Sequence, residues 1–177
     1  MKQFKEALKL LKDSDEFKEW KEKNPETYLS YAMYIVEDED DNWKIGYYHK
    51  EHDKVTSFDV GDKIKVEPED KVLKEKDKTV GKIDAGKVKH DISDAVTTAV
   101  NLQEEEYATE APKKIIAILQ TLGGEQVWNI TFFTQSFNTL NFKIRSESLR
   151  VIDKKLQPLF KMDQKGMADL AEKLQKK

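Results

Sequence analysis

The chain has 177 residues, of which 38% are hydrophobic and 37% are charged. Its 31 basic and 34 acidic residues nearly cancel and are interleaved, so no basic face for nucleic acid is predicted. Cysteine is absent, which excludes disulfides, thiolate nucleophiles and cysteine-ligated zinc within these residues.

The N-terminal segment is predicted to be a helix from about Lys2 to Asn24. Ser14 can cap its second half after a kink, and Pro25 ends it. Its apolar residues recur at helical spacing: Phe4, Ala7, Leu8, Leu11, Phe17 and Trp20. No apolar run of signal-peptide or membrane-spanning length follows the lysine-rich start, so we expect a cytoplasmic protein.

Three strands and a short fourth are expected next. Residues 28–36 are rich in tyrosine, isoleucine and valine, as in a buried strand. In the following strand Trp43, Ile45 and Tyr47 alternate with residues of a more polar face. A third strand is expected at 54–60 and a short fourth at 64–66.

The second half of the chain repeats this order. It follows a lysine- and aspartate-rich stretch, interpreted as a linker that Val80, Ile83 and Val88 could still pin to the body. Asp91 or Ser93 can cap a second helix. Strands are then expected at 113–122, 127–134, 139–144 and 149–152, with Gly123 and Gly124 making a tight hairpin turn.

Trp43 and Trp128 each open a copy of one strand pattern. The first copy contains Trp43, Ile45, Tyr47, Val55, Phe58 and Val60, and the second contains Trp128, Ile130, Phe132, Leu140, Phe142 and Ile144. The tryptophan strands match at an offset of 85 residues, but Phe58 and Phe142 match at 84, as a one-residue change in a hairpin would produce. We therefore predict one supersecondary unit used twice, with both tryptophans buried in equivalent places.

A resemblance to a known family lies in the strand that begins with Val127 and Trp128 and in its hairpin to Leu140–Ile144. A helix, a strand, a tryptophan-led strand and a hairpin in this order resemble the PepSY family and its cystatin-like relatives. In that family the meander continues through an aspartate and a glycine, and Asp59–Gly61 matches this better than Arg145–Ser148. The resemblance implies a mostly extracytoplasmic module that regulates a peptidase or binds a protein.

The predicted fold is α+β, with two helix-plus-antiparallel-meander repeats of cystatin-like or PepSY-like type. The expected divisions are a first repeat at 1–75, a linker at 76–90, a second repeat at 91–161 and a C-terminal amphipathic helix at 162–177. In the last, Asp163 can cap a helix with the stripe Met167, Leu170, Ala171 and Leu174. Such a short helix should dock, either on its own sheet or on another chain.

Polar clusters offer little site chemistry. His49 and His52 lie three positions apart in a turn, whereas zincin ligands lie four positions apart on a helix, so a solvated loop is predicted. Asp38, Asp40 and Asn42 resemble the start of a calcium loop, but the required glycine and closing glutamate are missing. We read Glu104–Glu106 as a solvated run. We expect no catalytic residue, no metal and no cofactor.

Tyr48 and Phe133 occupy matching places on the strand face opposite the tryptophans. An exposed aromatic pair on a sheet is a natural binding platform, unless the other repeat or a helix covers that face. We predict that a partner binds sheet surface near Tyr48 and Phe133 rather than the acidic turns.

The protein is expected to be a non-catalytic protein-binding or regulatory module. A peptidase would fit as its protein partner. One alternative is a carrier that holds a small apolar ligand in a concave sheet pocket. A weaker alternative is a metal-dependent hydrolase that uses His49 and His52. Neither nucleic acid nor membrane is an expected partner, and the oligomeric state stays open.

Overall fold

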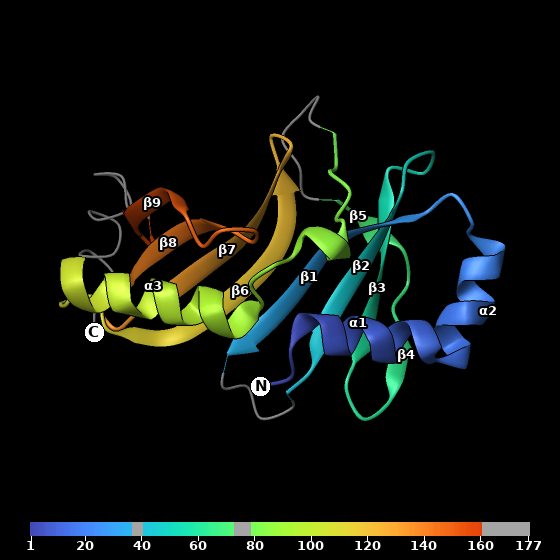
Figure 1. Ribbon diagram of the computed structural model, residues 1–177, viewed down its shortest axis with the longest axis horizontal. Coiled ribbons are helices and arrows are strands. Elements are labelled where there is room, and N and C mark those ends of the chain that lie inside the picture. Colours follow the sequence, from blue (N-terminus) through green and yellow to red (C-terminus); the bar gives the residue numbers. More distant parts are fainter. Residues whose placement is uncertain (37–40, 73–78, 161–177) are drawn as a thin grey trace, which may run out of the picture.

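The computed structural model describes residues 1–36, 41–72 and 79–160, and its strands join one antiparallel sheet with the helices on one face (Figure 1). The first half contains α1 (Phe4–Asp13), α2 (Asp15–Lys23), β1 (Tyr28–Val36), β2 (Trp43–His49), β3 (Lys54–Val60), β4 (Ile64–Val66) and β5 (Asp70–Lys71). The second half contains η1 (Ala85–Lys87), α3 (Ile92–Glu106), β6 (Pro112–Leu122), β7 (Glu125–Thr134), β8 (Asn138–Arg145) and β9 (Val151–Pro158).

The predicted α+β class is confirmed. Within the described residues the sheet has nine strands in the order β4-β3-β2-β1-β6-β7-β8-β9, with β5 also beside β3. The predicted C-terminal helix at 162–177 lies outside the described residues.

Ser14 breaks the N-terminal helix as predicted. Its backbone is extended, its hydroxyl donates to the carbonyl of Leu11 at 2.7 Å, and its Oγ accepts from the Phe17 N–H at 3.2 Å. One side chain therefore provides hydrogen-bond partners for backbone groups at the end of α1 and at the start of α2. The change of direction lets α2 pack Phe17 and Trp20 on the sheet.

The two tryptophan hairpins have the same register. Trp43 pairs with Val60 in the first hairpin, and Trp128 pairs with Ile144 in the second. The loop between β2 and β3 is one residue longer than the loop between β7 and β8. That single residue explains the predicted change of offset from 85 to 84.

The two repeats join through their first strands. β1 and β6 pair antiparallel, and Met33 lies opposite Ile118, its own counterpart at an offset of 85. The small buried residues Ala32 and Ala117 lie symmetrically on either side of this pair. An approximate two-fold axis therefore passes through the Met33–Ile118 pair, and one continuous sheet results.

Both indoles lie at the centre of the core in equivalent settings, as predicted. They are fully buried, and their ring centroids are 6.3 Å apart. The Nε1 of Trp43 donates to the carbonyl of Lys2 at 2.9 Å, and the Nε1 of Trp128 donates to the carbonyl of His90 at 3.0 Å. Each acceptor is the residue just before a helix N-cap, so each tryptophan fixes the start of its repeat's helix to the sheet.

Asp91 caps two helices. Its Oδ1 accepts from the N–H of Ile92, in α3, at 2.7 Å and from the N–H of Phe4, in α1, at 2.8 Å. Its Oδ2 accepts from the N–H of Lys5 at 3.3 Å. The two helices accordingly lie end to end across the sheet with their N-termini together (Figure 1).

The segment before α3, interpreted from its sequence as a linker, is packed against the body through the apolar residues that left this alternative open. Ile83 and Val88 are buried, and the Ile83 N–H donates to the carbonyl of Leu29 at 2.9 Å. The N–H groups of Lys89 and His90 both donate to the carbonyl of Ser146. These contacts hold the connection in place at both repeats.

Candidate binding site

The sheet face opposite the helices carries a groove over the first repeat, with a volume of about 740 Å³. Side chains alternate between the two faces of a strand. Residues next in the sequence to those on the buried tryptophan face therefore point to this open side. The floor residues are Ser30, Tyr31, Met33, Lys44, Val55, Ser57, Ile118 and Gln120. Segment 67–72 and Val80 form the wall. We call this site the open-face groove.

Tyr31 lies across Gly46 in the floor. The two residues pair across β1 and β2, and a Cβ added at Gly46 would lie 2.0 Å from Cε1 of Tyr31. The absence of a side chain at Gly46 therefore lets the ring lie flat on the sheet. The phenol shares a hydrogen bond of 2.7 Å with Oγ of Ser57, and burial raises the pKa of Tyr31. The phenol is therefore a neutral hydrogen-bonding group in the floor.

Charges of both signs border the groove. The Nζ of Lys44 lies 2.7 Å from Oε1 of Glu67 and 3.9 Å from Oδ1 of Asp59. The hydrogen bond to Glu67 raises the pKa of Lys44, so its ammonium is held in the charged form. Asp70 and Lys71 add a further pair of opposite charges to the wall.

The second repeat has a different surface at the equivalent place. Lys44 and Ser57 correspond to Asn129 and Asn141. The Nδ2 of Asn141 donates to Oδ1 of Asn129 at 2.6 Å and to Oγ1 of Thr131 at 2.8 Å. The two amides thus bond to one another across the strands, and the open-face groove lies over the first repeat and the adjoining strand β6.

Tyr48 and Phe133 both lie on the open face, but the structure does not bring them together. Tyr48 is only 4% exposed: its hydroxyl donates to Asp53 at 2.5 Å, and its ring centroid is 5.5 Å from that of Tyr28. Phe133 is half-buried on β7, beyond β1 and β6. The two-fold arrangement places these equivalent residues at opposite ends of the sheet, so they form no joint platform. Binding near either residue remains a prediction.

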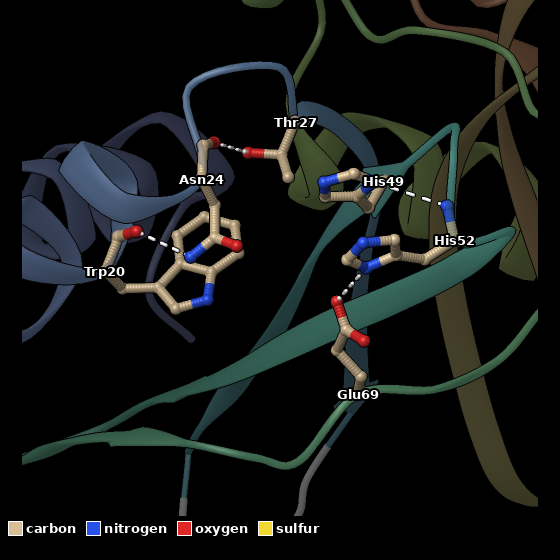
Figure 2. A network of polar contacts seen from close by, with 6 residues as sticks. All are labelled: Trp20, Asn24, Thr27, His49, His52 and Glu69. Atoms are coloured by element: carbon tan, nitrogen blue, oxygen red, sulfur yellow. Dashed lines mark hydrogen bonds and ion pairs between the residues drawn. The ribbon is translucent and has the colours of Figure 1, made fainter.

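His49 and His52 stack on one another in the β2–β3 turn (Figure 2). Their ring centroids are 3.7 Å apart, with 7° between the planes. Imidazole lone pairs lie in the ring plane and zinc–nitrogen bonds are about 2.0 Å long, so rings stacked in this way cannot both bind one ion. His52 instead contacts Oε1 of Glu69 at 3.0 Å, which lowers the pKa of Glu69. The described residues contain no group of three metal-type ligands.

The acidic clusters have ordinary surroundings where they are described. Glu106 forms an ion pair with Lys154 of β9, and Glu104 and Glu105 are exposed. The residues at 38 and 40, in the predicted acidic turn, lie outside the described residues. Sequence reasoning missed buried Glu110, which accepts hydrogen bonds that close the β7–β8 turn.

A second cavity, of about 840 Å³, lies between α2, the sheet and η1. Lys21 lines it, and its Nζ donates to the carbonyls of Thr27 at 2.6 Å and Pro25 at 3.0 Å. Desolvation lowers the pKa of Lys21. These bonds tie α2 to the start of β1, so Lys21 has a structural role.

Comparisons with known proteins give the fold and no family. No family model matches this chain, and no curated protein matches it. Among solved structures, it is similar to a putative lipoprotein from Clostridium difficile 630, with a TM-score of 0.51 and 14% identity, over 81% of this chain and 91% of that one. At this identity the likeness shows the fold alone.

This match corrects the predicted location. The expected cytoplasmic location is contradicted, because the similar chain is a putative lipoprotein. None of the helices in the described residues is long and apolar enough to cross a membrane. The prediction failed because it inferred the cellular compartment from the first residues of the sequence. The fold itself does not determine the compartment.

Proposed function

We propose that this protein is a non-catalytic binding module that holds an apolar segment of a protein partner in the open-face groove. The observation that carries the proposal is the groove itself, where the apolar floor residues Met33, Val55 and Ile118 lie beside charges of both signs. A peptide fits this composition because it offers apolar side chains together with polar amides. The floor hydroxyls and the Lys44–Glu67 pair would orient the amides.

The partner class that we propose is a peptidase, whose activity the module would regulate. The PepSY resemblance of the tryptophan hairpins supports this class. Support for a binding role also comes from Tyr31, since its phenol is neutral and hydrogen-bonded to Ser57. A neutral phenol of raised pKa is a poor general base, whereas it is a good contact for a peptide.

We propose further that the module works outside the cytoplasm. The support is the likeness in fold to the lipoprotein. A protease added to intact source cells would digest an exposed protein and spare a cytoplasmic marker. Protection of both proteins until the cells are lysed would contradict this location.

Photo-crosslinking in source cells tests the groove as the binding site. A photoreactive residue at Ile118, in the floor, should capture one protein species by mass spectrometry. The matched control is the same residue at Ile116, on the same strand and face but outside the groove. Equal capture from both positions, or capture from neither, would contradict the proposal.

A carrier of a small apolar ligand is the second candidate, because a volume of about 740 Å³ lies within the usual size of small-molecule sites. Native mass spectrometry of protein purified from source cells separates the two candidates. A bound small mass that is lost in Ile118→Lys and kept in Ile116→Lys would favour the carrier. Unliganded protein together with a crosslinked partner would favour the binding module.

A further inference from the structure

The cavity of about 840 Å³ beside α2 lies on the helix side of the sheet, away from the open-face groove. Its lining includes four buried residues of the core: Phe17, Leu29, Tyr47 and Ile83. The rings of Phe17 and Tyr47 contact one another, with 4.9 Å between their centroids. The volume lies within the usual size of small-molecule sites. We call this site the helix-side cavity.

The hydroxyl of Tyr47 forms no hydrogen bond with any described residue, although Tyr47 is only 5% exposed. Every fully enclosed side-chain polar atom within the described residues has a hydrogen-bond partner, so this hydroxyl is not enclosed and opens to the cavity that Tyr47 lines. Burial raises the pKa of Tyr47 to about 12, so the phenol keeps its proton at neutral pH. Because buried polar groups nearly always have a partner, a donor is available here for a ligand.

The second repeat shows that core packing does not need this hydroxyl. Phe132 takes the place of Tyr47 at an offset of 85 residues and is fully buried. It meets Phe142 at 5.7 Å between ring centroids, much as Tyr47 meets Phe58 at 6.0 Å. The oxygen atom of Tyr47 is therefore a feature of the first repeat alone, and it lies where that repeat has a cavity.

Positive charge collects around the helix-side cavity. Lys12, Lys21 and Lys82 line it together with a single carboxylate, that of Asp84. Within the described part of the chain, none of these three lysines forms an ion pair. Backbone carbonyls hold the Nζ of Lys21 at 5.9 Å from the ring centroid of Tyr47. The whole chain has a net charge of −3, so this local excess of positive charge is opposite in sign to the charge of the protein.

We propose that the helix-side cavity binds a small carboxylate with an apolar body. The three lysines attract the carboxylate, a ligand oxygen accepts from the Tyr47 hydroxyl, and the apolar body packs on the core residues of the lining. A carboxylate fits better than a phosphate, because no arginine lines the cavity and the Gly86 N–H already donates to Oδ1 of Asp84 at 2.9 Å. This site is separate from the open-face groove and does not depend on the function proposed for that groove.

Isothermal titration calorimetry of the full chain with decanoate tests the proposal. We expect decanoate to bind at a single site, and decanol, which has the same alkyl chain without the charge, to bind several-fold more weakly. Tyr47→Phe should weaken decanoate binding about tenfold, because it removes one hydrogen bond. This variant should keep the fold, since phenylalanine packs at the equivalent place in the second repeat.

Paired lysine variants test the role of charge. Lys12→Gln with Lys82→Gln should weaken decanoate binding about fivefold, as the loss of two partly exposed charge pairs would. The matched control is Lys5→Gln with Lys87→Gln, which removes the same charges from α1 and from the segment before α3, but outside the helix-side cavity. The control should bind decanoate as the parent does.

Other outcomes overturn the proposal. Equal binding of decanoate and decanol would show that the lysines select no anion. Absence of decanoate binding, or an affinity that neither Tyr47→Phe nor the cavity lysine pair changes, would show that the cavity is not the site. Ile118→Lys, in the open-face groove, should leave the affinity unchanged. Loss of binding in that variant alone would mean that decanoate binds in the groove instead.

Discussion

A single carboxylate links the helices of the two repeats. Asp91 accepts hydrogen bonds from three backbone N–H groups, one in its own helix and two, at Phe4 and Lys5, in α1. Gln3 precedes α1 but provides no side-chain cap of its own. The negative charge also lies at the positive ends of two helix dipoles. One residue therefore orders the junction at the centre of the molecule.

Asp91→Ala should lower the free energy of unfolding by about 2 kcal/mol, the upper end for loss of one cap, because two helix starts lose their acceptor. Urea unfolding followed by circular dichroism measures this loss. Asp94→Ala is the matched control, since it removes the same charge from the first turn of α3 without removing a cap. Equal losses in the two variants would show that charge rather than capping matters.

Gly46 is the residue on which the groove floor depends. Gly46→Ala should displace the Tyr31 ring, because the new methyl group would overlap it, and should destabilise the fold by about 1–3 kcal/mol. Adding Tyr31→Ala to this variant should recover part of the loss. A double-mutant cycle of unfolding free energies measures the coupling. Additive effects would contradict the contact.

The stacked histidines are predicted to hold no catalytic metal, because their rings would have to separate before one ion could contact both. Protein dialysed after exposure to zinc should keep no stoichiometric metal by elemental analysis. One zinc per chain that disappears in His49→Ala with His52→Ala would refute this prediction and favour a hydrolase.

At the scale of elements, each tryptophan joins a hairpin to a helix start. Trp43→Ala and Trp128→Ala should each lower the free energy of unfolding by about 3–5 kcal/mol, since both indoles are fully buried and hydrogen-bonded. Thermal and urea unfolding measure both variants. Trp20→Ala should cost less, because Trp20 is only partly buried on α2. A large loss in only one repeat would show that the settings are not equivalent in energy.

Edge strands were the elements that sequence patterns described least well. β9 extends to Pro158, well beyond the expected end at 152, and β5 was not anticipated. Residues 153–155 are charged and exposed, so they show none of the apolar alternation by which a half-buried strand is found. Interior strands such as β2 and β7 have a buried face and were located to within two residues at each end.

At the scale of the whole molecule, alkaline pH should weaken the fold through Tyr47. Burial raises its pKa from 10.0 to about 12. A raised pKa means that the folded protein keeps the phenol proton while the unfolded chain loses it. The stability from Tyr47 is thus complete below pH 10 and is lost as pH rises from 10 to 12, by about 2–3 kcal/mol.

Urea unfolding between pH 9 and pH 12 checks this dependence. Tyr47→Phe should show a shallower decline than the parent, because phenylalanine has no proton to lose. Lysine residues titrate in the same range in both proteins, so the difference between the two curves isolates Tyr47. Parallel curves would contradict a raised pKa at this position.

Local patterns in the sequence determined most of the elements, the break at Ser14, the duplicated hairpins and their change of register, because periodicity and capping act between residues near one another in the chain. They also indicated which strand face lies opposite the tryptophans, but not that this face carries a groove. A glycine inside a strand, such as Gly46, signals that another group approaches the backbone closely. Only the pairing of β1 with β2 showed that this group is Tyr31.

Only the tertiary structure decided how the repeats combine. The pairing of β1 with β6 made one sheet, and it placed Tyr48 and Phe133 at opposite ends of the open face. The double cap at Asp91 joins residues 87 positions apart, and the groove wall depends on where segment 67–72 runs beside β3. Such long-range contacts depend on edge pairing and packing across the whole chain, so no local pattern in the sequence encodes them.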